Sequence, residues 1–269
     1  MGNFNIKRSG HRNDIRRGAT TPVQIDKKVN DLPMNLSFLN SPFKNSRERN
    51  IINKWEKITD KETIIISFVS DPPGSDFYSK SVHSLVNTVD RLGYDYIFHQ
   101  YECDRNYFQN CCYKPVFIEK ILKETGKNLI WIDGDTSLKN GIDSFFNGPS
   151  NYDIGLVSYN GQITGFVASP IFFVNTDTSR DLISKWASHC EDSVENGRFE
   201  LDHDALKHAI LPSMRNRIKI SLKGSNFHKG DILDNVNSTV PHKVEILKEI
   251  AKINETRPFI YKTNDFIIL

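Results

Sequence analysis

Short apolar runs recur along this chain, and their positions do not alternate between apolar and polar. Runs of this kind are typical of strands that are buried on both faces of a sheet. We predict five such strands and a short sixth one near the end. They are Thr63–Val69, Tyr96–Phe98, Leu129–Ile132, Asp153–Val157, Phe166–Val174 with an interruption at Ser169-Pro170, and Ile218–Leu222.

Stretches with helical spacing of apolar residues separate these runs. The spacing predicts helices over Phe77–Leu92, Lys114–Thr125, Thr178–His189, Glu200–Ile210 and Val244–Ile253. Pro115 suits the first turn of the second helix, because a helix leaves the first N–H groups unpaired, and Gly126 suits the position after its end. The alternation of strands and helices predicts an α/β fold with a mainly parallel, Rossmann-like central sheet and flanking helices.

The first 45 residues differ from the rest of the chain. The first twenty positions contain five lysines and arginines but only one acidic residue, Asp14, and few apolar residues. Such a composition buries too little apolar surface to offset the entropy of ordering, so we expect a tail or a strap. A basic arm for RNA or an anionic membrane is the alternative interpretation.

Residues 46–58 follow, with Ile51, Ile52, Trp55 and Ile58 on one face of a predicted helix. We therefore divide the chain into a basic N-terminal extension with a packed helix, residues 1–60, and an α/β domain, residues 61–269.

The composition of the chain limits which binding partners and which cellular compartment we expect for this protein. Lys and Arg number 35 against 33 Asp and Glu, a formal charge of +2, which is too balanced to indicate nucleic-acid binding. The four cysteines form no CxxC pair, so we expect reduced thiols. We find neither a signal-peptide pattern nor an apolar run of transmembrane length. These features predict a cytoplasmic protein without a transmembrane segment.

The candidate metal-binding residues directly follow the apolar run Leu129–Ile132, where Asp133 and Asp135 flank Gly134. Open α/β sheets bind ligands beyond the carboxyl ends of their strands. Two carboxylates one residue apart can meet one cation there, and a hard ion held by few protein oxygens keeps positions free for substrate phosphates. We therefore predict a Mn²⁺ or Mg²⁺ site, with a capped turn as the alternative.

Other candidates follow from their positions. Ser67, Val69 and Asp71 lie at the end of the first buried strand, where a nucleotide binds in a doubly wound sheet. Lys114 and Lys229 are candidate phosphate contacts, since an ammonium suits a phosphate as a mobile point charge. Solvent exposure is the alternative for both lysines.

This order of parts resembles the GT-A class of nucleotide-sugar glycosyltransferases over about residues 62–232. The matching parts are the first strand with its loop, Asp133-Gly134-Asp135 after the third strand, the helix start at Asp202-His203, and His228-Lys229-Gly230. The last of these is one residue shorter than the H-x-x-G of related enzymes, and Ala168-Ser169-Pro170 stands where the family often has Asn or Ser before Gly.

The resemblance implies roles for these residues. Asp133 and Asp135 would bind manganese or magnesium on the diphosphate of the donor, with Asp133 also counted as a nucleotide contact, and His228 would complete the metal shell. Asp202 would contact the donor sugar or the acceptor. The implied reaction is transfer of a sugar from a nucleoside diphosphate, UDP by analogy with the class, to a glycan or another hydroxyl acceptor.

The stereochemistry stays open. An inverting enzyme needs a carboxylate within hydrogen-bond reach of the acceptor hydroxyl, and Asp202 is the first candidate, followed by Asp204 and Glu200. A retaining enzyme needs no such base. Asp202 also fits a purely structural role, because a helix N-terminus favours an acidic side chain.

Two other functions compete with glycosyl transfer. A phosphatase of the haloacid dehalogenase type also places D-x-D at a strand end, but on its first strand and followed by x-T/V, whereas Ser137 stands here. An inactive GT-A-like module that only binds sugars or proteins is the second alternative. Metal-dependent nucleotide binding separates these hypotheses.

Overall fold

The computed structural model describes a sheet flanked by helices over residues 47–71, 74–105, 107–143, 152–159, 161–162, 165–196, 202–215, 218–223 and 233–235. The N-terminal tail, the helix expected over 244–253, His228 and Lys229 lie outside the described residues. None of the described helices is long and apolar enough to cross a membrane.

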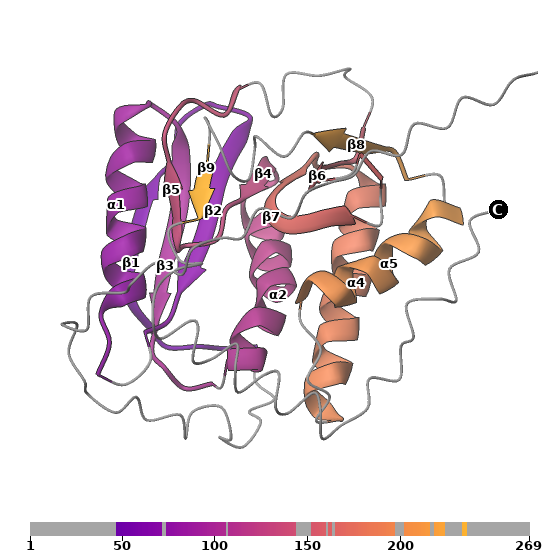
Figure 1. Cartoon of the computed structure of the whole chain (residues 1–269), viewed down its shortest axis with the longest axis horizontal. Coiled ribbons are helices and arrows are strands. Elements are labelled where there is room, and N and C mark those ends of the chain that lie inside the picture. Colours follow the sequence, from indigo (N-terminus) through magenta and orange to yellow (C-terminus); the bar gives the residue numbers. More distant parts are fainter. Residues whose placement is uncertain are drawn as a thin grey trace, which may run out of the picture. The chain divides into compact units, whose positions relative to one another are not determined.

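Seven strands form the central sheet of the described chain (Figure 1). In spatial order they are β1 (Ile51–Lys57), β3 (Asp95–Tyr101), β2 (Thr63–Val69), β4 (Asn128–Trp131), β7 (Phe166–Phe173), β6 (Ile154–Ser158) and β8 (Ile220–Lys223). Only β1 and β7 run against their neighbours, so five of the seven strands share one direction. The predicted mainly parallel sheet is therefore confirmed. A separate pair joins β5 (Thr136–Leu138) to β9 (Leu233–Asn235).

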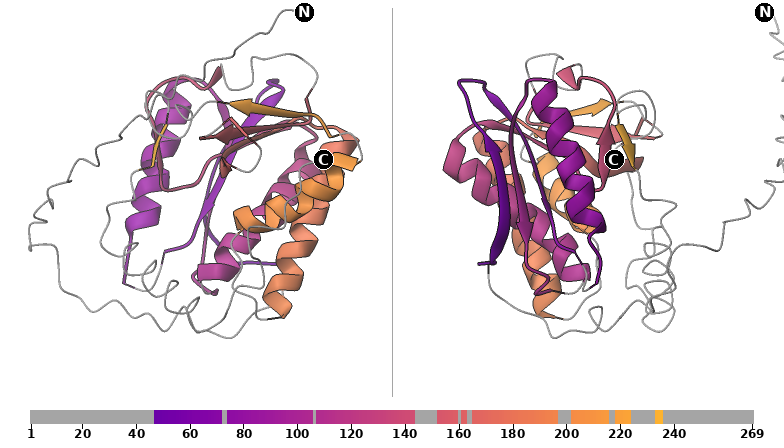
Figure 2. Two further views of the ribbon diagram at one scale, coloured as in Figure 1. Left: turned by 45° about the vertical axis from the view of Figure 1, so that its right-hand side comes forward. Right: turned by 90° about the vertical axis from the view of Figure 1, so that its left-hand side faces the viewer.

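Helices cover both faces of the sheet (Figure 2). The helix α1 (Phe77–Arg91) packs on one face, and α2 (Tyr107–Thr125), α4 (Asp177–Glu195) and α5 (Asp202–Arg215) pack on the other. Successive strand residues point to opposite faces, so Ile65 joins the core under α1 whereas Ile64 and Ile66 join the core under α2 and α4. Two apolar layers thus enclose the central strands, as their unbroken apolar runs predict.

The helix predicted over residues 46–58 is wrong. Residues Ile51–Lys57 form β1, an edge strand that pairs antiparallel with β3. Most of this strand is exposed, so its sequence lacks the alternation of apolar and polar residues that marks a half-buried strand. Its pairing with β3 decides the conformation, and no local signal in the sequence reports that pairing.

Two other boundaries also differ from the prediction. The helix α2 begins at Tyr107 rather than near Lys114, so Pro115 lies inside the helix and removes one backbone hydrogen bond there. Burial of the apolar residues Cys112, Tyr113, Val116 and Phe117 in the core stabilises the helix on either side of Pro115. The strand β7 continues through the predicted interruption, with a cis peptide bond before Pro170.

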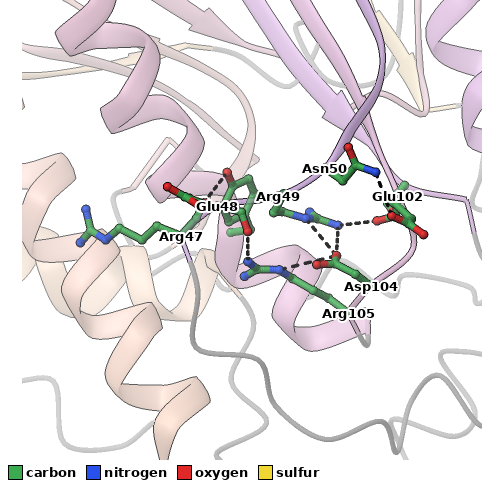
Figure 3. Close-up of polar contacts among 9 residues, drawn as sticks. Arg47, Glu48, Arg49, Asn50, Glu102, Asp104 and Arg105 are labelled. Atoms are coloured by element: carbon green, nitrogen blue, oxygen red, sulfur yellow. Dashed lines mark hydrogen bonds and ion pairs between the residues drawn. The ribbon is translucent and has the colours of Figure 1, made fainter.

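An arginine cluster fixes the segment that leads into β1 (Figure 3). Arg49 donates to the carboxylate of Asp104 at 3.1 and 3.2 Å, and Arg105 approaches the same carboxylate to 3.8 Å. The guanidinium of Arg49 is buried over the rings of Tyr101 and Tyr113, with its carbon 4.7 and 5.0 Å from their centroids. These contacts join the start of the edge strand to β3 and α2.

A buried histidine on β3 gives the fold a pH dependence. Nδ1 of His99 lies 3.1 Å from the hydroxyl of Tyr101, and the imidazole packs edge-on against Phe117. Burial lowers the pKa of His99 to about 4; the ammonium of Lys54 adds to this effect, while Glu56 opposes it.

We expect His99 to make the protein less stable in acid. The unfolded chain, with an imidazole pKa of 6.5, binds more protons than the folded chain between pH 6.5 and pH 4. The free energy of unfolding should therefore fall by about 3 kcal/mol across this window because of His99. Urea denaturation at several pH values should show a shallower decline in His99→Gln, whereas a His83→Gln variant of an exposed histidine should follow the wild type. Parallel declines in His99→Gln and wild type would contradict this assignment.

Candidate active site

The turn Asp133-Gly134-Asp135 connects β4 to β5 and presses against the end of β2. The N–H of Thr136 donates to the carbonyl of Asp133 at 3.0 Å and closes the turn. A Cβ on Gly134 would lie 2.2 Å from Cγ1 of Val69, so only glycine allows this approach. Val69 is therefore a buried residue that packs against the turn. This packing explains why a glycine separates the two carboxylates.

Two side chains hold the carboxylate of Asp133. The indole Nε1 of Trp131 donates to Oδ1 at 2.7 Å, and Nζ of Lys114 lies 3.1 Å from the same oxygen. The backbone N–H of Asp133 donates to Oγ of Ser169 on β7 at 2.9 Å. About a third of the Asp133 side chain stays exposed, so the carboxylate is oriented but reachable.

Lys114, on α2, is the buried cation of the site. Nζ lies 2.6 Å from Oδ2 of Asp202 and 3.1 Å from Oδ1 of Asp133, and it donates to the carbonyl of Ala168 at 3.1 Å. An ammonium has three N–H groups, and here three protein acceptors face it. We therefore interpret Lys114 as a residue that positions two carboxylates, rather than as the predicted phosphate contact.

Burial by itself lowers the pKa of the Lys114 ammonium. The two carboxylates outweigh this effect and raise the pKa overall, so the side chain stays charged. The ammonium also lies 5.2 Å from the ring centroid of Trp131, which adds a cation–π contact. A permanent positive charge is thus enclosed between β4, β7 and α5.

The two predicted catalytic aspartates, Asp202 and Asp204, have different surroundings in the structure. Asp202 is the buried first residue of α5, and its carbonyl accepts from Nε1 of Trp186 at 2.8 Å. Asp204 is more exposed and pairs with His203 and Lys207, each at 3.1 Å. The shared ammonium of Lys114 brings Asp202, but not Asp204, to the D-x-D turn.

The predicted nucleotide contacts at the end of β2 have different surroundings. Asp71 accepts from the N–H groups of Tyr78 and Ser79 at 2.7 and 3.1 Å, so its carboxylate caps the start of α1. Ser67 is fully buried behind Gly134, and its hydroxyl has no hydrogen-bond partner among the described residues. Ser67 therefore packs behind the D-x-D turn, whereas the Asp71 carboxylate is engaged by the start of α1.

Tyr78 is a site residue that sequence reasoning missed. Burial raises the pKa of its phenol, and the carboxylates of Asp135, Asp71 and Asp133 raise it further. The hydroxyl therefore stays protonated in the field of the D-x-D turn. Its helical spacing indicated only a core position on α1, and nothing local distinguished it from a packing residue.

The donor set fits a hard divalent ion. Among the described residues no three His, Cys, Asp or Glu side chains form a ready-made metal cluster. Mg²⁺, however, is commonly held by one or two carboxylates together with substrate phosphates. Asp133 and Asp135 supply two such carboxylates at a strand end. His228, the third predicted ligand, lies outside the described residues.

Comparison with known proteins agrees with this architecture. No protein-family model and no curated protein sequence matches the chain. A glycosyltransferase involved in the glycosylation of the major capsid of PBCV-1 superposes with a TM-score of 0.51 at 12% identity, covering 70% of this chain and 98% of that one. The fold is that of a GT-A-like glycosyltransferase.

A second solved structure is less similar. The galactosyltransferase LgtC, in complex with donor and acceptor sugar analogues, has a TM-score of 0.37 at 10% identity and covers 61% of this chain and 74% of its own. At this distance no residue of this chain can be assigned from that enzyme. The similarity to the PBCV-1 enzyme confirms the predicted GT-A fold class. It shows the fold alone, so the roles of individual residues are argued from the geometry above.

We expect Lys114→Met to be strongly destabilising. The variant leaves the carboxylates of Asp133 and Asp202 buried or half-buried without their cation, a loss of about 3–5 kcal/mol in the free energy of unfolding. Lys207→Met, which removes a partly exposed partner of Asp204, should cost about 1 kcal/mol or less. Urea denaturation measures both values, and equal losses would contradict the bridging role of Lys114.

Proposed function

We propose that this protein is a metal-dependent glycosyltransferase. It moves a sugar from a nucleoside diphosphate donor, UDP-linked, to a glycan or another hydroxyl acceptor. The observation that carries the proposal is the D-x-D turn at the carboxyl end of β4 in a glycosyltransferase fold, joined through Lys114 to Asp202. Ligands of open α/β sheets bind at such strand ends.

The reaction breaks the bond between the anomeric carbon and the diphosphate oxygen, so negative charge develops on the leaving group. A bound divalent ion would stabilise that charge. Asp135 and Asp133 would hold the ion, and the contacts of Asp133 Oδ1 with Trp131 and Lys114 would orient the Asp133 carboxylate in advance. A preorganised ligand lowers the cost of ordering when the donor binds.

Asp202 is the carboxylate that we place against the sugar or the acceptor. In an inverting reaction it would accept the proton of the attacking hydroxyl, and in a retaining reaction it would orient the sugar. The ammonium of Lys114, 2.6 Å from Oδ2, would orient this carboxylate for either role. Asp204 instead engages His203 and Lys207, so we propose it as a control rather than as the base.

The place of the turn along the chain argues against the phosphatase alternative. In that mechanism the first aspartate of D-x-D attacks phosphorus, and the motif follows the first strand. Here the turn follows the fourth strand along the chain.

Nucleotide binding tests the donor and the metal together. We expect UDP to raise the thermal stability of the wild-type protein only when Mn²⁺ is present, by about 2.7 kcal/mol at a hundredfold excess over Kd. Asp135→Asn should abolish this stabilisation, because it removes one of the two carboxylates that would hold the ion. Asp181→Asn, on the exposed face of α4, is the matched control and should respond like the wild type. An undiminished, metal-dependent shift in Asp135→Asn would refute the metal site.

Sugar transfer tests the role of Asp202. We expect Asp202→Asn to lower kcat by about 10²–10⁴-fold if this carboxylate is the proton acceptor, with the nucleotide-induced thermal shift retained. Asp204→Asn should change kcat little. Product stereochemistry, read by proton NMR of the new glycosidic bond, distinguishes inversion from retention. If Asp204→Asn proved the more damaging variant, the assignment of the base would be wrong.

A further inference from the structure

The outer edge of β1 is the most exposed apolar part of the described sheet. This strand ends the spatial order of the sheet, with β3 on its inner side and no described strand on its outer side. Ile52 is 53% exposed, and Ile58, directly after the strand, is 50% exposed. An edge strand leaves half of its backbone N–H and C=O groups without a sheet partner, so it is a template for another strand.

The side chains on one face of this strand are self-complementary. Lys54 and Glu56 share a face, since they pair with His99 and Ile97 of β3; the register of β1 shifts between Ile51 and Asn53, and the strand ends at Lys57. A second copy, paired antiparallel about a two-fold axis at Trp55 and perpendicular to the sheet, would place Lys54 opposite Glu56 at two symmetric positions. Opposite charges directly across two strands stabilise their pairing.

The registers centred on Lys54 and on Glu56 lack this match. With the two-fold axis at Lys54 two ammonium groups would face each other. With the axis at Glu56 two carboxylates would oppose each other. Like charges directly across strands are destabilising, so the sequence favours the register centred on Trp55.

The strand is also held in place before any partner arrives. Lys57 pairs with Asp90 of α1 at 2.8 Å, and Asn53 donates to Gln100 of β3 at 2.6 Å. The indole of Trp55 packs edge-on against His83 on the opposite face from Lys54 and Glu56. The arginine cluster around Asp104 fixes the residues that precede the strand (Figure 3). Preorganisation of this kind reduces the ordering cost of an association.

We propose that β1 pairs antiparallel with β1 of a second copy of this chain, joining two seven-stranded sheets into one continuous sheet. The occupant is a second copy because the charges of Lys54 and Glu56 match their own two-fold image. The proposal is independent of the chemistry at the D-x-D turn.

Charge reversal tests the proposed register. Lys54→Glu places two carboxylates at each of the two symmetric positions, and Glu56→Lys places two ammonium groups there. We expect each variant alone to dimerise about tenfold or more weakly than the wild type in sedimentation velocity. An equimolar mixture of the two variants should form a heterodimer with near wild-type affinity, because each Glu then faces a Lys.

The mixture separates the interface from an internal effect. Lys54 and Glu56 also form an ion pair within one strand, 2.5 Å apart, and both variants lose it. Only a contact between copies can restore association in the mixture, since neither chain regains its internal pair. The double variant Lys54→Glu/Glu56→Lys should also recover dimerisation, and Lys80→Glu on α1 should behave like the wild type. Circular dichroism checks that every variant is folded.

Two results would overturn the proposal. A wild-type protein that stays monomeric at every accessible concentration shows that this edge has no second copy as its partner. A dimer that Lys54→Glu and Glu56→Lys leave unchanged, or that their mixture fails to restore, shows that another surface carries the association.

Discussion

The site depends on one buried ammonium. Transfer of a lysine side chain from water into the protein interior costs several kcal/mol, and this cost is recovered only with close, well-oriented acceptors. Lys114 has three of them, from Asp133, Asp202 and the carbonyl of Ala168. Because these acceptors come from the turn after β4, from β7 and from the start of α5, one side chain couples three elements that are far apart in sequence.

The described part of the site carries more negative than positive charge, even with this ammonium. Asp133, Asp135 and Asp202 contribute three formal negative charges and Lys114 one positive charge, a formal balance of −2 for these four residues. Carboxylates gathered at a strand end with too few cations repel one another, and a divalent ion would balance them. This electrostatic argument supports a metal at the turn without reference to any related enzyme. Burial raises the pKa of the Tyr78 phenol, and these carboxylates raise it further.

The sequence predicted what depends on local pattern. Unbroken apolar runs located the central strands, and the position of Asp133 and Asp135 after one of them located the turn. The sequence-based prediction was wrong where a contact between residues far apart in the chain determines the secondary structure. Ile51, Ile52, Trp55 and Ile58 fit a helical face as well as an exposed edge strand, and only pairing with β3 distinguishes the two.

The same limit applies to the side chains of the site. Lysines are mostly exposed, so a phosphate contact or a surface position was the natural expectation for Lys114. Its burial follows from the convergence of α2, β7 and α5, which no spacing along the chain reveals. Asp71 likewise lies at the expected strand end, yet the start of α1 occupies its carboxylate. Position along the chain therefore located the site better than it identified the partners of each residue.

The sheet order also constrains how a dimer would present its active sites. The D-x-D turn lies at the ends of β2 and β4, and β3 and β1 separate it from the outer edge. Pairing through β1 would therefore cover neither site. In an antiparallel pair about a two-fold axis, the parallel strands of the two copies run in opposite directions, so their carboxyl ends lie at opposite ends of the joined sheet. Each copy would then meet its acceptor from its own side, and a large glycan on one site would not obstruct the other.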